Sequence, residues 1–233
     1  FANVSGVNVA PWSSYVIENP NLASVNAQGA ITALAEGMTK IIATYGGIKA
    51  TQSLEVLHAP PTLAHRYTFD ETPGSAYVAD LVNGADGQVV GGAAFDGAGA
   101  ITFDGSSGYV NLPNGIISSL DDMSLETWVT WTGNRVWERI FDFGSSNAGE
   151  DVPGAGQKYL FLTPWSDTGR VRFAIRTAAN DNPLVEGATV MQNGVERHIV
   201  ITYSSRGGSV KLYVDGKEVA SAVATIPLSE ITD

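Results

Sequence analysis

The stretch Leu212–Val219, Leu-Tyr-Val-Asp-Gly-Lys-Glu-Val, decides the fold class of this chain. Residues that favour strands stand on both sides of Asp215-Gly216, a dipeptide typical of the two-residue turn in a β-hairpin. Just before it, residues 197–204 read Arg-His-Ile-Val-Ile-Thr-Tyr-Ser, a further run rich in β-branched residues. The two stretches together predict consecutive antiparallel strands.

Further strands are predicted in both directions from this hairpin, and no segment keeps the period of a helix. Many short strands without intervening helices indicate a β-sandwich or a jelly roll. The predicted strands of this larger part are residues 64–69, 87–95, 99–104, 108–112, 124–131, 138–143, 157–163, 170–176, 197–204 and 209–215.

The first part of the chain predicts a smaller group of strands. A hairpin is expected around Asn26–Gly29, and Gly46-Gly47 is expected to turn the chain between two longer strands. Pro60-Pro61 then favours an extended spacer, because consecutive prolines restrict the backbone. We therefore predict a partial domain at residues 1–58, a linker at 59–62 and a second domain at 63–233.

Composition excludes several classes of function. The 233 residues carry a formal net charge of −11 and no run of Lys or Arg, so nucleic acid is not expected as a partner. No apolar stretch approaches the roughly 20 residues that span a bilayer, so membrane insertion is not expected either. The chain has no cysteine, which excludes disulfides, thiolate metal sites and a cysteine nucleophile.

The first segment resembles the bacterial Ig-like group 2 family. The matching residues are Ile17–Gly29, Ile31–Gly37 and Ile41–Gly47. Family members have further strands before these, so the resemblance implies an Ig-like sandwich that is incomplete at its N-terminus. Such domains serve as stalks and surface modules, some of them adhesive.

The second segment resembles a laminin-G-like domain of the concanavalin A-like lectin and glucanase superfamily. The stretches that carry this resemblance are His65–Asp70, Ile101–Gly105, Tyr109–Leu112, Met123–Val129, Arg139–Gly144, Arg197–Tyr203 and Lys211–Gly216. The resemblance implies a jelly-roll sandwich in an extracellular or cell-surface bacterial protein. The family usually closes with a strand bearing an Asp-Glu pair, which does not follow Ile231–Asp233 here. Neighbouring domains or copies of the chain are therefore expected as partners at open sheet edges.

Catalysis is not expected, although the superfamily contains glucanases. Those enzymes hold two carboxylates two residues apart on one strand, whereas the nearest pair here is Glu138 and Asp142. Four residues of extended strand separate carboxylates by roughly 13 Å, while glycoside hydrolysis needs about 5 to 9.5 Å. The three histidines are scattered, and His198 is expected to be a hydrogen-bonded residue of the sandwich.

A carbohydrate site is expected between Trp131 and Arg176, because sugars bind to aromatic rings beside hydrogen-bonding groups. Trp128 is instead expected in the core, since apolar residues flank it. Trp137 and Trp165, beside polar turns, fit burial and ligand contact equally well. The predicted site is Trp137, Arg139, Asp142, Trp165 and Arg176, within a wider set that adds Trp131, Asn134, Arg135, Tyr159, Asp167 and Arg172. If residues 138–143 form a regular strand, Arg139 and Asp142 point to opposite faces.

Calcium is the one cofactor that the resemblance implies. Lectin-like relatives often hold a structural Ca²⁺ beside the first and last strands, which points to Asp70 and, among the other loop carboxylates, Asp104. No Asp-x-Asp-x-Asp-Gly loop is present, and solvated carboxylates are the ordinary state of an acidic surface.

Two classes of function remain open. One is a non-catalytic carbohydrate-binding or adhesion module, whose partner is a polysaccharide or glycan. The other is a structural component of a surface layer, stalk or filament. A solvent-exposed tryptophan on a sheet face would favour the first, and strand exchange at an open edge would favour the second.

Overall fold

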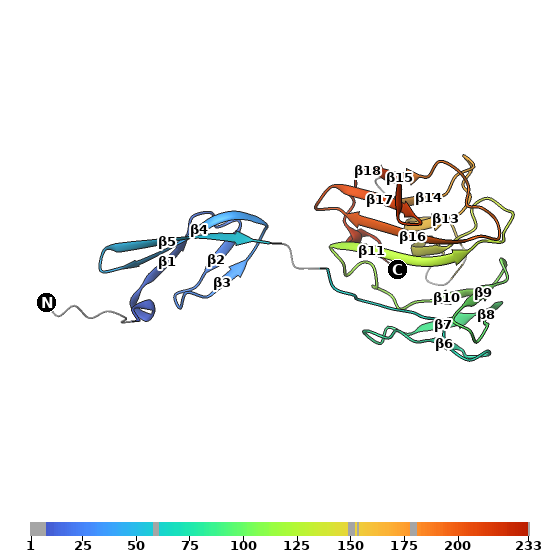
Figure 1. Ribbon diagram of the computed structural model, residues 1–233, viewed down its shortest axis with the longest axis horizontal. Helices are drawn as coiled ribbons and strands as arrows, with labels where there is room; N and C mark the ends of the chain where they lie inside the picture. The colour runs from blue at the N-terminus through green and yellow to red at the C-terminus, as the bar shows by residue number, and fades with distance from the viewer. Residues whose placement is uncertain (1–7, 58–60, 149–151, 153, 178–180, 233) are drawn as a thin grey trace. The chain divides into compact units, whose positions relative to one another are not determined.

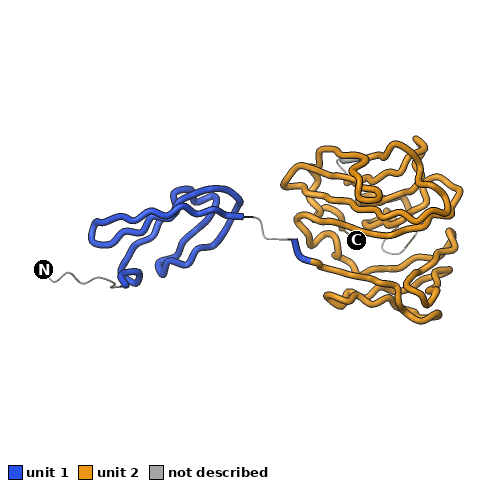
Figure 2. Tube along the Cα trace, viewed as in Figure 1, with its two compact units in different colours: residues 1–62 blue, residues 63–233 orange. Residues whose placement is uncertain are grey.

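The computed structural model describes residues 8–57, 61–148, 152, 154–177 and 181–232, with the backbone alone at 181–184. The chain divides into two compact units, residues 1–62 and 63–233 (Figure 2). The division lies at the end of the expected linker, whose residues 59 and 60 are outside the described residues. Each unit is described by itself below.

The first unit consists of three short strands and two longer ones, all antiparallel where they pair (Figure 1). Its elements are a 3-10 helix at Ala10–Trp12, β1 (Ser14–Ile17), β2 (Ala23–Val25), β3 (Ile31–Ala33), β4 (Gly37–Tyr45) and β5 (Ile48–Val56). Strands β1, β4 and β5 form one sheet in that order, and β2 pairs with β3. The predicted turn at Gly46-Gly47 is confirmed, with positive φ at both glycines as a tight hairpin turn requires.

The core of the first unit is small. Ile17, Ala23 and Val56 are its buried apolar residues, and Val25, Ile41 and Leu54 pack against them. Several large apolar side chains of the unit are exposed, among them Trp12, Val16, Met38, Ile48 and Leu57. The first unit therefore gains little of its stability from apolar burial.

The second unit holds the remaining strands, all antiparallel where they pair. They are β6 (Tyr77–Val78), β7 (Gly87–Val90), β8 (Ala93–Phe95), β9 (Ile101–Phe103), β10 (Tyr109–Asn111), β11 (Asp122–Thr130), β12 (Phe141–Ser146), β13 (Gly156–Thr163), β14 (Arg172–Arg176), β15 (Asp181–Glu186), β16 (Glu196–Ser204), β17 (Ser209–Val214), β18 (Lys217–Ala222) and a 3-10 helix at Leu228–Glu230. The two larger sheets have the orders β12-β13-β14-β15 and β11-β16-β17-β18. Two smaller sheets pair β10-β7-β6 and β8-β9.

The two four-stranded sheets face each other across one apolar core. The sheet β12-β13-β14-β15 contributes Leu160, Leu162 and Phe173 to this core, and the sheet β11-β16-β17-β18 contributes Ile201 and Leu212. All five residues are 0% exposed. The prediction of an all-β sandwich is thus confirmed. None of the helices in the described part of the chain has the length and apolarity to cross a bilayer.

The strand predictions differ from the structure in several places, and residues 87–95, expected as one strand, form the two strands β7 and β8. Residues 64–69 are not a strand, because their backbone instead bonds to the loop at residues 80–85. The strand expected at 138–143 begins only at Phe141. Strand β15 escaped prediction because it contains Pro183, and it lies at a sheet edge, where a residue without an N–H is tolerated.

Asp80 organises the loop that replaces the first expected strand. One carboxylate oxygen accepts hydrogen bonds from the backbone N–H groups of Arg66 and Val82, and the other from those of Asn83 and Ala85. His65 Nδ1 lies 2.8 Å from the second oxygen, and the Asp80 side chain is fully buried. Burial alone would raise the pKa of Asp80, but these hydrogen bonds outweigh it and hold the pKa well below its ordinary value.

Candidate functional site

The outer face of the β12–β15 sheet, turned away from the core, carries the polar residues that the sequence singled out. Antiparallel register places Gly144, Tyr159 and Arg176 in one row across β12, β13 and β14. The adjacent row contains Asp142 and Phe161 on neighbouring strands. Because side chains two residues apart share a face, these residues form one continuous surface.

A groove of about 540 Å³ lies on this face. The described residues that line it are Arg139, Asp142, Gly144, Ser145, Ser146, Val152, Gly154, Ala155, Gly156, Tyr159 and Arg176. Small residues make up most of its wall, and its polar and aromatic side chains are two arginines, one aspartate, two serines and one tyrosine. This volume lies within the range of small-molecule binding sites.

Glycines shape the groove. Gly144 has φ 134°, and a Cβ atom there would lie 2.0 Å from the carbonyl oxygen of Lys158 on the paired strand. A Cβ atom at Gly156 would lie 2.7 Å from the ring of Tyr159. The absence of side chains at these two positions thus allows β12 and β13 to approach closely and leaves room for the tyrosine ring.

Arg139 and Asp142 meet at the groove instead of facing apart. Arg139 Nε donates to Asp142 Oδ2 at 2.9 Å, and its Nη1 donates to the carbonyl oxygen of Trp137. The guanidinium carbon also lies 4.0 Å from the ring centroid of Phe161. The expectation of opposite faces required a regular strand over residues 138–143, and this condition is not met, because β12 begins only at Phe141.

Burial raises the pKa of Asp142 above its ordinary value, although the charge and hydrogen bond of Arg139 act in the opposite direction. Nearly half of the side chain, 46%, remains exposed. The two facts agree if the groove residues displace part of the water around the carboxyl group while one side stays accessible. Asp142 is therefore an accessible hydrogen-bond acceptor at the groove.

Trp137 positions the groove residues without lining the groove. Its φ of 69° is unusual for a bulky residue. Its backbone N–H donates to the backbone carbonyl oxygen of Trp165 at 2.8 Å. The indole meets Phe161 edge-on, and the guanidinium carbon of Arg172 lies 5.1 Å from its centroid. Trp137, 37% exposed, thus stabilises the turn from which Arg139 extends.

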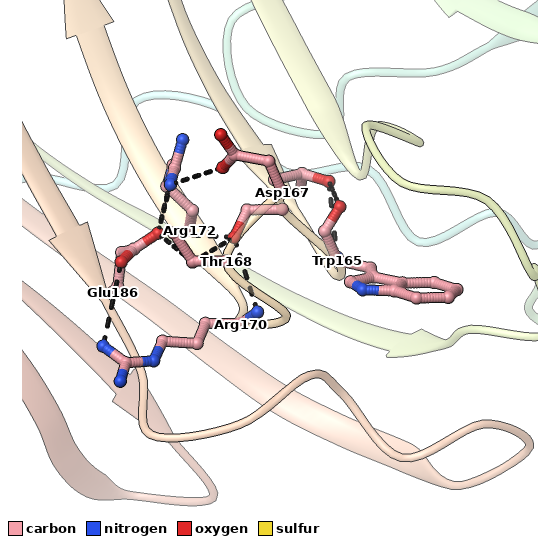
Figure 3. Close-up of polar contacts among 8 residues, drawn as sticks. Trp165, Asp167, Thr168, Arg170, Arg172 and Glu186 are labelled. Carbon is pink, nitrogen blue, oxygen red and sulfur yellow. Dashed lines mark hydrogen bonds and ion pairs between the residues drawn. The ribbon is translucent and has the colours of Figure 1, made fainter.

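Trp165 belongs to the neighbouring packing and not to the groove. Its ring packs edge-on against Trp131, with centroids 6.1 Å apart. Figure 3 shows its indole pointing away from the pair formed by Arg172 and Glu186. Arg172 also bonds Asp167 at 2.8 Å, so its charge is neutralised by two acids.

Glu186 is the centre of that ionic cluster. Burial alone would raise its pKa, but hydrogen bonds from Thr168 and Arg172 outweigh burial and lower it. Arg170 approaches the other carboxylate oxygen at 3.9 Å (Figure 3). The cluster holds Arg172 at the start of β14, whereas the groove residue Arg176 lies at the other end of the strand, and the charges of the cluster are satisfied internally.

The prediction that Trp128 lies in the core is wrong, because its side chain is 62% exposed. On strand β11 the apolar neighbours of Trp128 point to the opposite face, so they do not bury it. The indole stacks on His198 of β16, with centroids 4.4 Å apart and planes 25° apart. His198 is hydrogen-bonded to Glu126 at 2.7 Å, in agreement with its expected role.

Asp104, one of the two predicted calcium ligands, is hydrogen-bonded within its own loop. Both carboxylate oxygens of Asp104 accept hydrogen bonds within its own loop, from the N–H groups of Ser106, Ser107 and Gly108 and from the Ser107 hydroxyl. These bonds lower its pKa strongly and hold the turn that follows Asp104. Within the described ranges, no three His, Asp or Glu side chains cluster to hold an ion.

The calcium predictions at Asp70 and Asp104 both stay untested. We expect a higher melting temperature in calcium than in EDTA if Asp70 is a ligand, and loss of that difference in Asp70→Asn. Equal melting temperatures for the wild-type protein in the two buffers would contradict it.

The structure thus brings Arg139, Asp142 and Arg176 together at the groove and places Trp137 and Trp165 behind or beside it. Tyr159, from the wider predicted set, is the aromatic residue that lines the groove. Ser145 and Ser146 escaped prediction. The available signal was the glycine- and serine-rich stretch 144–146 directly after a strand of aromatic residues.

Comparison with known proteins assigns the larger unit. A sequence model described as the concanavalin A-like lectin/glucanases superfamily, of laminin-G type, matches residues 104–233, more than half of the chain. The match includes every residue of the groove. A search of curated proteins gives no match.

Proposed function

Because the chain belongs to the concanavalin A-like lectin/glucanase superfamily, we propose that its larger unit binds a carbohydrate chain in the groove on the outer face of β12, β13 and β14, without cleaving it. The observation that carries the proposal is the groove itself, where an aromatic ring, two guanidinium groups and a carboxylate converge.

The chemistry of the lining fits a sugar. Tyr159 offers an aromatic ring against which the C–H face of a pyranose packs. Arg139 and Arg176 supply donors to ring and hydroxyl oxygens, and Asp142 accepts hydrogen bonds from hydroxyl groups.

Two observations support a binding rather than a hydrolytic role. Asp142 is the one carboxylate among the described residues that line the groove. The carboxylate of Glu138 is instead hydrogen-bonded to Trp131 Nε1 at 2.6 Å and lies 3.6 Å from Arg135 Nε. Glycoside hydrolysis requires two carboxyl groups that flank the scissile bond.

We further propose that the module acts outside the cell or on its surface, where polysaccharide is available. The first unit would be a bacterial Ig-like group 2 spacer. Its two small antiparallel sheets and its core of Ile17, Ala23 and Val56 support this proposal.

A structural role in a surface layer, stalk or filament is the second candidate. The observation in its favour is the number of large apolar side chains that the first unit exposes, such as Ile48 at 77% and Trp12 at 67%. Where such side chains form one contiguous patch, they mark contacts with other domains or other copies. The two roles are compatible if the first unit assembles and the second binds sugar.

Tyr159→Ala is expected to weaken polysaccharide binding about tenfold, since one stacked ring and its contact area are lost. Binding is measured by affinity gel electrophoresis on polysaccharides that retard the wild-type protein in an initial panel. Tyr159→Phe keeps the ring and should retain most of the affinity.

The matched control is Tyr109→Ala, which removes a tyrosine of β10 that is 42% exposed and distant in sequence from the groove. It should bind like the wild-type protein. Equal affinity of Tyr159→Ala and the wild-type protein would contradict the proposed site.

A further inference from the structure

The outer face of the other large sheet carries a second exposed aromatic surface. Trp128 lies on β11, the edge strand of the sheet β11-β16-β17-β18. It faces His198 directly across the strand pair, and the two rings are stacked. Trp128 is 62% exposed as a residue, and 27% of the His198 side chain is exposed.

The indole is held in position from below. His198 is fixed at its ring by Glu126 at 2.7 Å and at its backbone N–H by Asp215 Oδ1 at 3.1 Å. Arg197 in turn bonds Asp215 at 2.7 Å. A single exposed apolar residue needs no explanation, but an exposed indole supported by a bonded imidazole is a preorganised planar surface.

We propose that the Trp128–His198 pair is a second carbohydrate-binding site, which takes a neutral pyranose on the ring face opposite the imidazole. The ligand class rests on the proposed function, but the site is separate from the groove. The stacking surface supplies the apolar contact that a pyranose ring requires.

The neighbours of Trp128 determine the charge of the ligand. Glu126 lies two residues before Trp128 on β11, on the same face of the sheet. Glu196 lies two residues before His198 on β16, also on that face. Their carboxylates flank the Trp128–His198 pair on both sides along the strands and accept hydrogen bonds from sugar hydroxyls. The same charges repel uronic acids and sulfated sugars.

The two sites lie on opposite sides of the larger unit. Each is on the outer face of a sheet, and the inner faces of both sheets form the common core. On this proposal, the larger unit holds two polysaccharide chains at once. A surface that presents many polysaccharide chains then binds it more tightly than one isolated polysaccharide chain does.

The test is Trp128→Ala in affinity gels that contain a neutral glucan, xylan or mannan, with polygalacturonate as the acidic comparison. We expect about tenfold weaker retardation by at least one neutral polysaccharide, at an unchanged melting temperature. Trp12→Ala is the matched control, because Trp12 is 67% exposed but lies in the first unit. It should behave as the wild-type protein does.

His198→Ala provides a second variant that keeps the indole and removes its support, and it should weaken retardation by the same polysaccharide. Unchanged retardation of Trp128→Ala in every neutral gel would overturn the inference, as would a wild-type protein retarded by polygalacturonate alone. The groove is judged separately by Tyr159→Ala. If Tyr159→Ala loses binding and Trp128→Ala retains it, the proposed function stands and the second site is refuted.

Discussion

Phe173→Ala is expected to lower the free energy of unfolding of the larger unit by about 3–5 kcal/mol, the range for deleting a buried aromatic ring. Phe173 is 0% exposed on the inner face of β14. Its ring lies 6.3 Å from that of Tyr203 on the opposing sheet and 6.5 Å from that of Phe141. Truncation leaves a cavity at the contact between the two sheets, which neighbouring rings cannot fill.

Guanidinium unfolding followed by circular dichroism measures this effect. Phe173→Leu retains most of the buried volume and should cost clearly less than the alanine variant. A loss below about 1 kcal/mol for Phe173→Ala would show that the two sheets do not share this packed core.

Asp80→Ala is expected to cost about 2–4 kcal/mol, because four backbone N–H groups lose a charged acceptor at once. The affected groups belong to the segment around Arg66 and to the loop from Val82 to Ala85. Asp80→Asn keeps the size of the side chain but turns an NH₂ group toward some of these donors. It should therefore be destabilising as well.

The contribution of Asp80 depends on pH in a defined direction. Its folded pKa lies below the ordinary value, so its contribution is present above an unfolded pKa of about 4 and is lost as the pH falls further. The difference in stability between the wild-type protein and Asp80→Ala should shrink between pH 5 and pH 3. A difference that stays constant over this interval would contradict the assignment.

The sequence predicted those strands whose local signals agree with the tertiary structure. The turn at Asp215-Gly216 has positive φ at both residues and joins β17 to β18 as expected. The run at residues 196–204 alternates between the core and the outer face. Where a distant group determined the backbone, prediction failed, as at residues 64–69, whose hydrogen bonds go to the Asp80 loop.

The site was predicted in part, for a similar reason. Arg139, Asp142 and Arg176 are charged residues in or beside apolar strands, and such residues are costly to bury, so their exposure at one face could be expected. Their meeting at one groove depends on where β12 begins and on the close approach that Gly144 permits. Trp128 was misassigned because its neighbours in sequence point to the other side of the sheet.

The most direct test of the central claim is a ¹H–¹⁵N titration of Trp128→Ala, which lacks the second surface, with an oligosaccharide from a polysaccharide that binds the wild-type protein. We predict chemical-shift changes centred on the amides of Ser145, Tyr159 and Arg176, at the groove of the β12–β14 face. Saturating changes confined to other strands, such as β7 and β10, would contradict the claim that this groove binds carbohydrate.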